Sequence, residues 1–341
     1  MKKHFIITLI FLIISSLMIV GCSSPADNNS DVKESSSGDA KIEKVFKIGI
    51  SQFVEHPALD GARQGFIDGL KEAGFEEGKN VDILLENAQA DFPTTQTIAN
   101  KLITENVDLI LAIATPSAQS AANATKDIPI LITAVTDPVE AGLVKSLEKS
   151  ETNVTGTTDM NPVHEQLELL KEILPQSKNV GVIYNAAEPN SVIQVDIAKE
   201  AAENMGLTIL EATVANSGEV NQAVQSLAGK VDAIYTPTDN TVASAISAIV
   251  KVANDANIPV IGSERGQVEG GAVATLGIDY YLLGKQTGFV AAKVLKGEDP
   301  EGIPIEGSKD LKLIINKKSA NILGLTIPEQ VLSRADEILE Q

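Results

Sequence analysis

The sequence is poor in residues that build disulfides and metal centres: its 341 residues include one cysteine, three histidines and no tryptophan. A single thiol cannot form an internal disulfide or a thiolate metal cluster. The histidines are His4, His56 and His164, and His4 falls in an N-terminal leader, so a histidine-built zinc site is not expected. We therefore expect neither a metal nor a cofactor.

Catalytic motifs are missing as well. The chain has no phosphate loop of the Walker type, no G-x-S-x-G elbow and no H-E-x-x-H pair. His56 lies on a loop, after Glu55 and before Pro57, and suits a ligand contact better than a general base. We expect that the protein is not an enzyme.

Basic residues are scarce relative to acidic ones. The chain carries 27 Lys and Arg against 46 Asp and Glu, a formal charge of −19. Removing residues 1–21 deletes two lysines and no acid, which takes the charge to −21. Such a surface argues against nucleic acid as a partner and against electrostatic adhesion to anionic lipid.

The N-terminal segment is typical of an export signal. Lys2 and Lys3 precede an apolar run that ends at Val20, and small residues follow it where a retained membrane anchor would carry charges. Ile19-Val20-Gly21-Cys22 resembles the lipobox of bacterial lipoproteins, in which the cysteine receives a diacylglycerol and becomes the first mature residue.

On that resemblance, residues 1–21 are a lipoprotein signal peptide and Cys22 carries the lipid anchor, with acyl chains such as palmitate. An ordinary signal peptide or an uncleaved anchor with an incidental cysteine is the alternative. Residues 22–44 are rich in Ser, Asp, Asn, Lys and Gly and predict a flexible tether. The body would be held at the cell membrane on its extracytoplasmic side.

The rest of the chain alternates between short apolar runs and stretches of helical periodicity, in two successive series. Continuous apolar strands are typical of parallel sheets covered on both faces, which predicts two α/β lobes with a cleft between them. The first series predicts strands at 45–50, 81–86, 107–114, 128–134 and 154–159, and helices at 58–73, 94–104, 117–125 and 139–148. The second predicts helices at 162–173, 190–205, 218–228 and 240–255, and strands at 179–185, 207–214, 231–237 and 258–263.

Polar loops follow six of these strands, where parallel sheets place their ligands. For any one loop a simple helix cap is the alternative, but six such loops from two lobes favour a binding site. They are SQFVEHP (51–57), ATPSAQ (114–119), TAVTDP (133–138), YNAAEPNS (184–191), TPTDN (236–240) and GSERG (262–266).

Several stretches, in order along the chain, resemble the substrate-binding lipoproteins of ABC importers in the tryptophan/tyrosine-type group: ATPSAQSAAN, TAVTDPVEAGLV, VGVIYNAAEPNS, IYTPTDNTVAS and LGLTIPEQVLSRADEI. The resemblance implies a type I periplasmic-binding-protein fold: two Rossmann-like lobes joined by a three-crossover hinge. It places 45–158 and 279–300 in an N-terminal lobe, and 159–278 and 309–341 in a C-terminal lobe.

The resemblance also implies an amino-acid ligand, often aromatic. Donors for its carboxylate are then expected from Thr115, Ser117, Ala118 and Thr136, and an anion for its ammonium from Asp239, with Asp137 or Glu264 as competitors. Phe53, Tyr184 and Tyr280 are expected wall residues, although each suits an aromatic core equally well. Further expected contacts are Ser51, Gln52, His56, Asn185, Glu188, Ser191, Asn240, Ser263 and Asp279.

The mechanism implied is closure of the hinge on the ligand, followed by recognition of the closed form by an ABC permease. We expect a monomer. A sugar or nucleoside binder on the same fold is the nearest alternative, and a transcription regulator is remote because a lipid signal, not a helix-turn-helix, precedes the first lobe.

Overall fold

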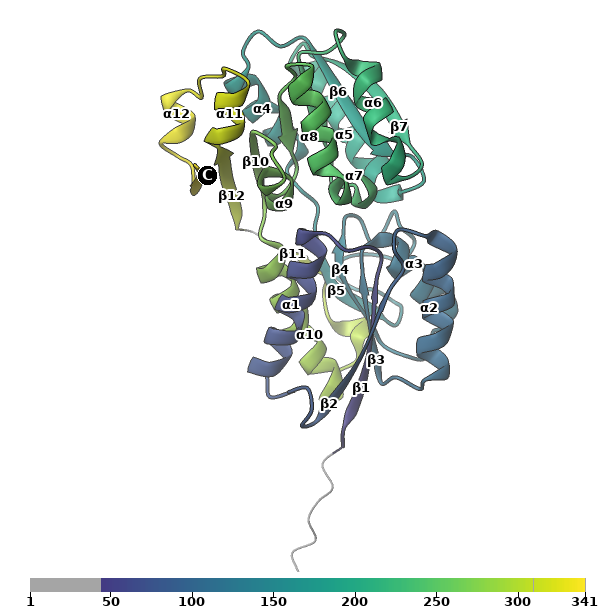
Figure 1. Ribbon diagram of the computed structural model, residues 1–341. Coiled ribbons are helices and arrows are strands. Elements are labelled where there is room, and N and C mark those ends of the chain that lie inside the picture. The colour runs from purple at the N-terminus through teal and green to yellow at the C-terminus, as the bar shows by residue number, and fades with distance from the viewer. Residues whose placement is uncertain (1–43, 309, 341) are drawn as a thin grey trace, which may run out of the picture. The chain divides into compact units, whose positions relative to one another are not determined.

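The computed structural model describes residues 44–308 and 310–340. The predicted signal peptide, Cys22 and the predicted tether up to residue 43 lie outside them. Figure 1 shows that the described chain forms two sheets, each with helices on both faces. The fold is thus the expected α/β type. None of the helices in the described ranges is long and apolar enough to cross a membrane.

The first sheet is entirely parallel, with the strand order β11-β5-β4-β3-β1-β2. Its central strands β3 and β4 are buried along their whole length, as their unbroken apolar sequences LILAI and ILITAV predict. The strands are β1 Phe46–Gln52, β2 Val81–Asn87, β3 Leu109–Ile113, β4 Ile130–Val135, β5 Val154–Thr158 and β11 Glu306–Gly307. The helices packed with this sheet are α1 Pro57–Glu72, α2 Phe92–Thr104, α3 Thr115–Ala124 and α10 Tyr280–Leu295, and together they form the first lobe.

The second sheet has the order β13-β12-β10-β9-β8-β6-β7 and is parallel except between β10 and β12. Two apolar clusters, on its two faces, build the core of this second lobe. Its strands are β6 Asn179–Asn185, β7 Thr208–Val214, β8 Ala233–Thr236, β9 Val260–Gly262, β10 Ala274–Ile278, β12 Leu311–Asn316 and β13 Glu337–Leu339. Its helices are α4 Val163–Ile173, α5 Pro189–Asn204, α6 Val220–Leu227, α7 Asn240–Ser244, α8 Ile246–Asp255, α9 Arg265–Glu269, α11 Lys317–Ile322 and α12 Glu329–Leu332.

The chain passes between the sheets after β5, after β10 and after β11. The third passage follows Gly307, within the stretch between residues 300 and 309 that the sequence assigned to neither lobe. A short 3₁₀ turn, Pro300–Gly302, leads into β11, whose Glu306 and Gly307 pair with Thr157 and Thr158 of β5. Residues up to Gly307 therefore still belong to the first sheet.

Two helix predictions need correction. Residues 139–148 form turns, not a helix, because Gly142 takes a positive φ of 73° and the Leu143 N–H bonds back to the Pro138 carbonyl, which ends the chain's single turn after Asp137. The predicted helix 240–255 is two helices, α7 and α8, separated at Ala245.

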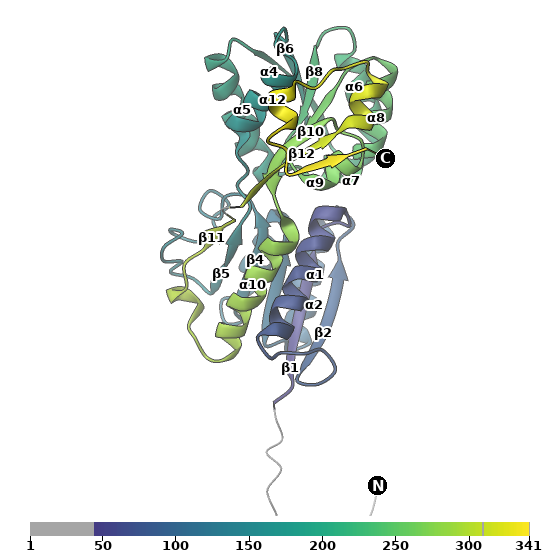
Figure 2. The same cartoon turned by 90° about the vertical axis from the view of Figure 1, so that its left-hand side faces the viewer.

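Helices α1 and α10 lie side by side, as Figures 1 and 2 show, although more than 200 residues separate their starting points, Pro57 and Tyr280. Glycines permit this approach. A Cβ at Gly65 would collide with the carbonyl of Tyr281, and one at Gly284 would collide with the carbonyl of Ala62. Because these two positions carry no side chain, α10 can pack directly against α1.

We expect Gly65→Ala to lower the free energy of unfolding by about 1–3 kcal/mol or more, because a rigid backbone carbonyl has to move. Denaturant titration measures this. Gly61→Ala is the matched control on the same helix: its Cβ would lie 3.7 Å from the Tyr281 nitrogen, an ordinary contact, and should be neutral or stabilising by up to about 1 kcal/mol. Equal stability of the two variants would contradict the packing argument.

Candidate functional site

A narrow cavity lies between the lobes, where loops at the carboxyl ends of strands from both sheets meet. Its volume is about 10 Å³, room for roughly one water molecule. No lysine or arginine is among the described residues that line it, whereas three carboxyl groups are. The lining residues are His56, Ala58, Leu59, Ala134, Thr136, Asp159, Asn190, Thr238, Asp239, Asn240, Ala243, Glu264, Gln267 and Tyr280.

The N-terminus of α3 lies at the carboxyl end of β3, and Thr115, Ser117 and Ala118 are not among the residues that line the cavity. Ala114, with φ of 77°, occupies the N-cap position, so Thr115 and Ser117 lie in the first turn. Both side chains are buried, and neither hydroxyl has a hydrogen-bond partner among the described residues. Ala118 already donates its N–H to the Ala114 carbonyl, so it is less suited to a ligand than the sequence indicated.

Buried polar atoms without partners collect at the strand ends that face the cleft. In the first lobe they are Ser51 Oγ, His56 Nδ1, Thr115 Oγ1 and Ser117 Oγ; in the second they are Asn190 Oδ1 and Ser263 Oγ. Of these residues, His56 and Asn190 line the cavity, and two further unpartnered atoms, Asn153 Oδ1 and Thr275 Oγ1, lie elsewhere. Since native proteins pair nearly all buried polar groups, this concentration is typical of a site that is completed by a polar ligand.

Asp159 is a cavity carboxylate that was not among the expected contacts, because residues 154–159 were predicted only as a strand at the lobe boundary. It is buried, and its two oxygens accept hydrogen bonds from the Thr136 hydroxyl (3.0 Å) and the Tyr280 hydroxyl (2.6 Å). Burial raises the pKa of Asp159. The available signal was its position directly after strand β5, equivalent to the polar loops after the other strands.

Asp239, the expected partner of a ligand ammonium, is engaged by its own lobe. It accepts hydrogen bonds from Val242 N at 2.8 Å, Asn185 N at 2.6 Å and Ser191 Oγ at 2.7 Å. Burial and the neighbouring Glu188 carboxylate raise the pKa of Asp239. The side chain lines the cavity but mainly joins the loops after β6 and β8.

Glu188 has the same structural role. Its carboxylate, fully buried, accepts from the backbone and side chains of Asn240 and Thr241 at the start of α7, and from the Asn190 amide. The two loops of the second lobe are therefore fixed by carboxylates that already have their donors.

Glu264 caps α9 by accepting the N–H groups of Gly266 and Gln267. Burial raises the pKa of Glu264 to about 7, because it disfavours the charged form. Asp137, the other expected competitor for the ammonium, lies in its own turn and does not line the cavity.

Of the three expected wall aromatics, only Tyr280 lines the cavity. Phe53 is fully buried and packs against Phe92, with ring centroids 5.1 Å apart, so it is a core residue. Tyr184 donates to Glu211 on the neighbouring strand, 2.6 Å away.

Of the remaining expected contacts, only His56 and Asn240 line the cavity. Gln52 donates to the Val54 carbonyl and to Asp60, and Asn185 and Ser191 hold Asp239. Asp279 caps α10 and lies outside the cavity.

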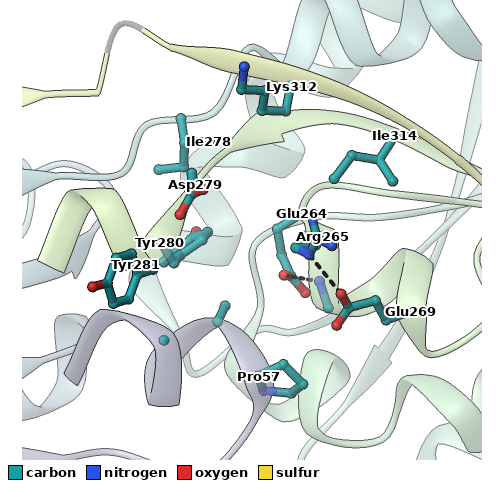
Figure 3. Close-up of a pocket in the computed structure, with 13 residues that line it drawn as sticks. Pro57, Glu264, Arg265, Glu269, Ile278, Asp279, Tyr280, Tyr281, Lys312 and Ile314 are labelled. Carbon is teal, nitrogen blue, oxygen red and sulfur yellow. Dashed lines mark hydrogen bonds and ion pairs between the residues drawn. The ribbon is translucent and has the colours of Figure 1, made fainter. Parts of the chain in front are cut away.

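A larger surface groove of about 220 Å³ adjoins the cavity and shares Ala58, Glu264 and Tyr280 with it (Figure 3). Pro57, Ile278 and Ile314 form apolar parts of its wall. Arg265, at its edge, is paired with Glu269 and Glu337. No group of three or more His, Cys, Asp and Glu side chains suited to a metal ion occurs within 44–308 and 310–340.

A model of the family described as ABC transporter substrate binding protein matches residues 47–339. The chain belongs to this family. The Tyrosine-binding protein of Clostridioides difficile is 48% identical over 308 residues, which span 90% of this chain and 88% of the relative.

Two solved structures are similar to this substrate-binding protein. The ABC domain from Streptococcus pneumoniae in complex with L-Trp is 41% identical, with a TM-score of 0.84 over 86% of this chain and 99% of that one. The ligand-free, open structure of a Clostridium difficile substrate-binding protein with adhesive properties is 50% identical, with a TM-score of 0.66 over 87% and 100%. The family binds solutes outside the cytoplasm and is not a family of enzymes.

The raised pKa of Glu264 predicts a pH dependence of stability. The pKa of Glu264 is about 7 in the folded protein against an ordinary value of 4.5. Its protonation therefore contributes fully to the free energy of unfolding below pH 4.5, and this contribution is lost as pH rises through 7. We expect wild type to lose about 3 kcal/mol relative to Glu264→Gln across that range, measured by denaturant titration at each pH. A difference between the two proteins that stays constant with pH would contradict the assignment.

Proposed function

We propose that this substrate-binding protein is the lipid-anchored component of an ABC importer and captures an amino acid, preferably an aromatic one, between its lobes. The observation that carries the proposal is the set of buried, unpartnered polar atoms around an inter-lobe cavity that contains carboxyl groups and no lining cation. The relatives that bind tyrosine and L-Trp support the ligand class.

The two ends of a free amino acid match two parts of the first lobe. The start of α3 offers the Thr115 and Ser117 hydroxyls and the positive end of a ten-residue helix, which suits a carboxylate. Asp159 accepts only two hydroxyl donors and has no basic neighbour in the cavity lining, so an ammonium would supply its counter-charge. We assign the ammonium to Asp159 in preference to Asp239, whose oxygens already accept three hydrogen bonds.

Binding requires the lobes to separate and close. A cavity with room for one water cannot admit an amino acid, so the ligand enters a more open form. The higher TM-score to the L-Trp complex than to the open structure, despite lower identity, supports a closed arrangement here. Contacts between the lobes, such as His56 to Asn240 and Gln194 to Thr136, both at 3.4 Å, would then be exchanged as the hinge moves.

Asp159→Asn should weaken binding of L-tyrosine and L-tryptophan by about 3–5 kcal/mol, because it leaves the buried ammonium without its anion. Isothermal titration calorimetry measures the loss. Asp137→Asn is the control, since Asp137 lies outside the cavity lining and should bind like wild type.

Unchanged affinity of Asp159→Asn would refute the ammonium assignment alone. Binding of sugars or nucleosides by wild type, with indifference to amino acids, would refute the proposed ligand class and favour the alternative function.

Membrane attachment through Cys22 rests on the lipobox-like sequence and the polar segment that follows it. We expect Cys22→Ser to release the protein into the extracytoplasmic fluid or to block removal of the leader, with unchanged ligand affinity. Fractionation followed by immunoblotting measures this. A variant that stays in the membrane fraction with its leader removed would show that the cysteine is not the anchor.

A further inference from the structure

His56 lines the cavity and has a buried ring nitrogen without a hydrogen-bond partner among the described residues. The residue lies between β1 and α1 in the first lobe, is 8% exposed and lines the cavity. Its Nε2 atom lies 3.4 Å from Asn240 Oδ1 in the second lobe. Its Nδ1 atom has no hydrogen-bond partner among the described residues.

The hydrogen-bond network fixes which nitrogen carries the proton. The Asn240 side-chain nitrogen donates to Glu188 Oε2 at 2.6 Å, and a carboxylate can only accept, so Asn240 Oδ1 must face His56. That oxygen is an acceptor, and therefore His56 Nε2 carries the hydrogen. Burial lowers the pKa of His56 to about 4, which keeps the ring neutral near pH 7. Nδ1 is then an unprotonated lone pair, a hydrogen-bond acceptor.

Asn190 adds a second acceptor of the same kind. Its side-chain nitrogen donates to Glu188 and to the Thr238 carbonyl, which leaves Oδ1 buried and unpartnered. Both residues line the cavity, one from each lobe. A ligand that enters the more open form and closes against these residues without a donor would leave the acceptors unpaired, and a buried unpaired acceptor is costly.

The donor that the acceptors require distinguishes between aromatic amino acids. The phenol of tyrosine carries an O–H and the indole of tryptophan carries an N–H, whereas the ring of phenylalanine has neither. Under the proposed function, the carboxylate and ammonium are taken by the start of α3 and by Asp159. The donor left for His56 is then on the side chain of the ligand.

We propose that His56 is a specificity-determining residue: it accepts a hydrogen bond from the ring donor of the ligand and so selects tyrosine and tryptophan over phenylalanine. The inference rests on the proposed function. Glu188 and Asn240 act through His56 as positioning residues. Glu188 and Asn240 belong to the second lobe, so they orient the His56 imidazole only when the lobes are closed. The hydrogen bond from the ring donor of the ligand therefore forms in the closed state.

The test is calorimetry of the full-length chain in detergent with L-tyrosine, L-tryptophan and L-phenylalanine. Wild type should favour the first two by on the order of 10²-fold or more, because a site built around a donor rejects the analogue that lacks it. His56→Phe should reduce this ratio by at least roughly tenfold, mainly by weakening tyrosine and tryptophan. His164→Phe makes the same exchange at a half-exposed position on α4 and should keep the wild-type ratio.

Asn240→Leu tests the positioning step, since it keeps His56 but removes the acceptor that fixes its proton. The tyrosine-to-phenylalanine ratio should fall, although the histidine remains. Nitrogen NMR of the imidazole gives a readout independent of affinity: wild type should show an unprotonated Nδ1 whose resonance shifts with tyrosine and not with phenylalanine.

Two results overturn the proposal. One is wild-type binding of tyrosine and phenylalanine with equal affinity. The other is a loss in His56→Phe that is the same for all three ligands, which would place His56 against their shared backbone. Failure of wild type to bind any of the three would instead refute the proposed function, and so the two failures are distinguishable.

Discussion

Carboxyl groups buried without a cationic partner govern the region between the lobes. Glu188, Asp159 and Asp239 have at most 1% of their surface exposed and receive their hydrogen bonds from N–H and O–H groups. Such groups are stable only where several donors converge. Each therefore fixes the loop conformations around it.

The sequence predicted the alternation of strands and helices and the loops that reach the cleft, because buried parallel strands leave unbroken apolar runs and parallel topology gathers their carboxyl ends. It failed at residues 139–148, where Gly142 adopts a left-handed conformation that ends the backbone turn after Asp137. Helical periodicity of the apolar residues does not report such a termination.

Within the site, the residue types predicted which side chains are polar, but not which of their atoms are free to bind a ligand. Asp239 and Asp159 have the same side chain, yet one accepts three hydrogen bonds from its own lobe and the other two from hydroxyls. Phe53 belongs to a loop that was predicted to reach the cleft, but its side chain packs in the core. Which atoms of a side chain are already paired depends on contacts between distant segments. The pairing of His56 with Asn240, 184 positions apart, is one such contact.

The late return of the chain to its first sheet has a consequence for biosynthesis. Helix α10 and strand β11 are made after most of the second lobe, yet α10 fills the face of α1 and β11 completes the edge beside β5. Domains commonly fold in the order in which they emerge, but here the segment that emerges first lacks part of its own core until residue 307 has appeared. A truncated chain that ends before Tyr280 would leave the α1 glycines uncovered. The first lobe thus cannot be completed until most of the second lobe has been made.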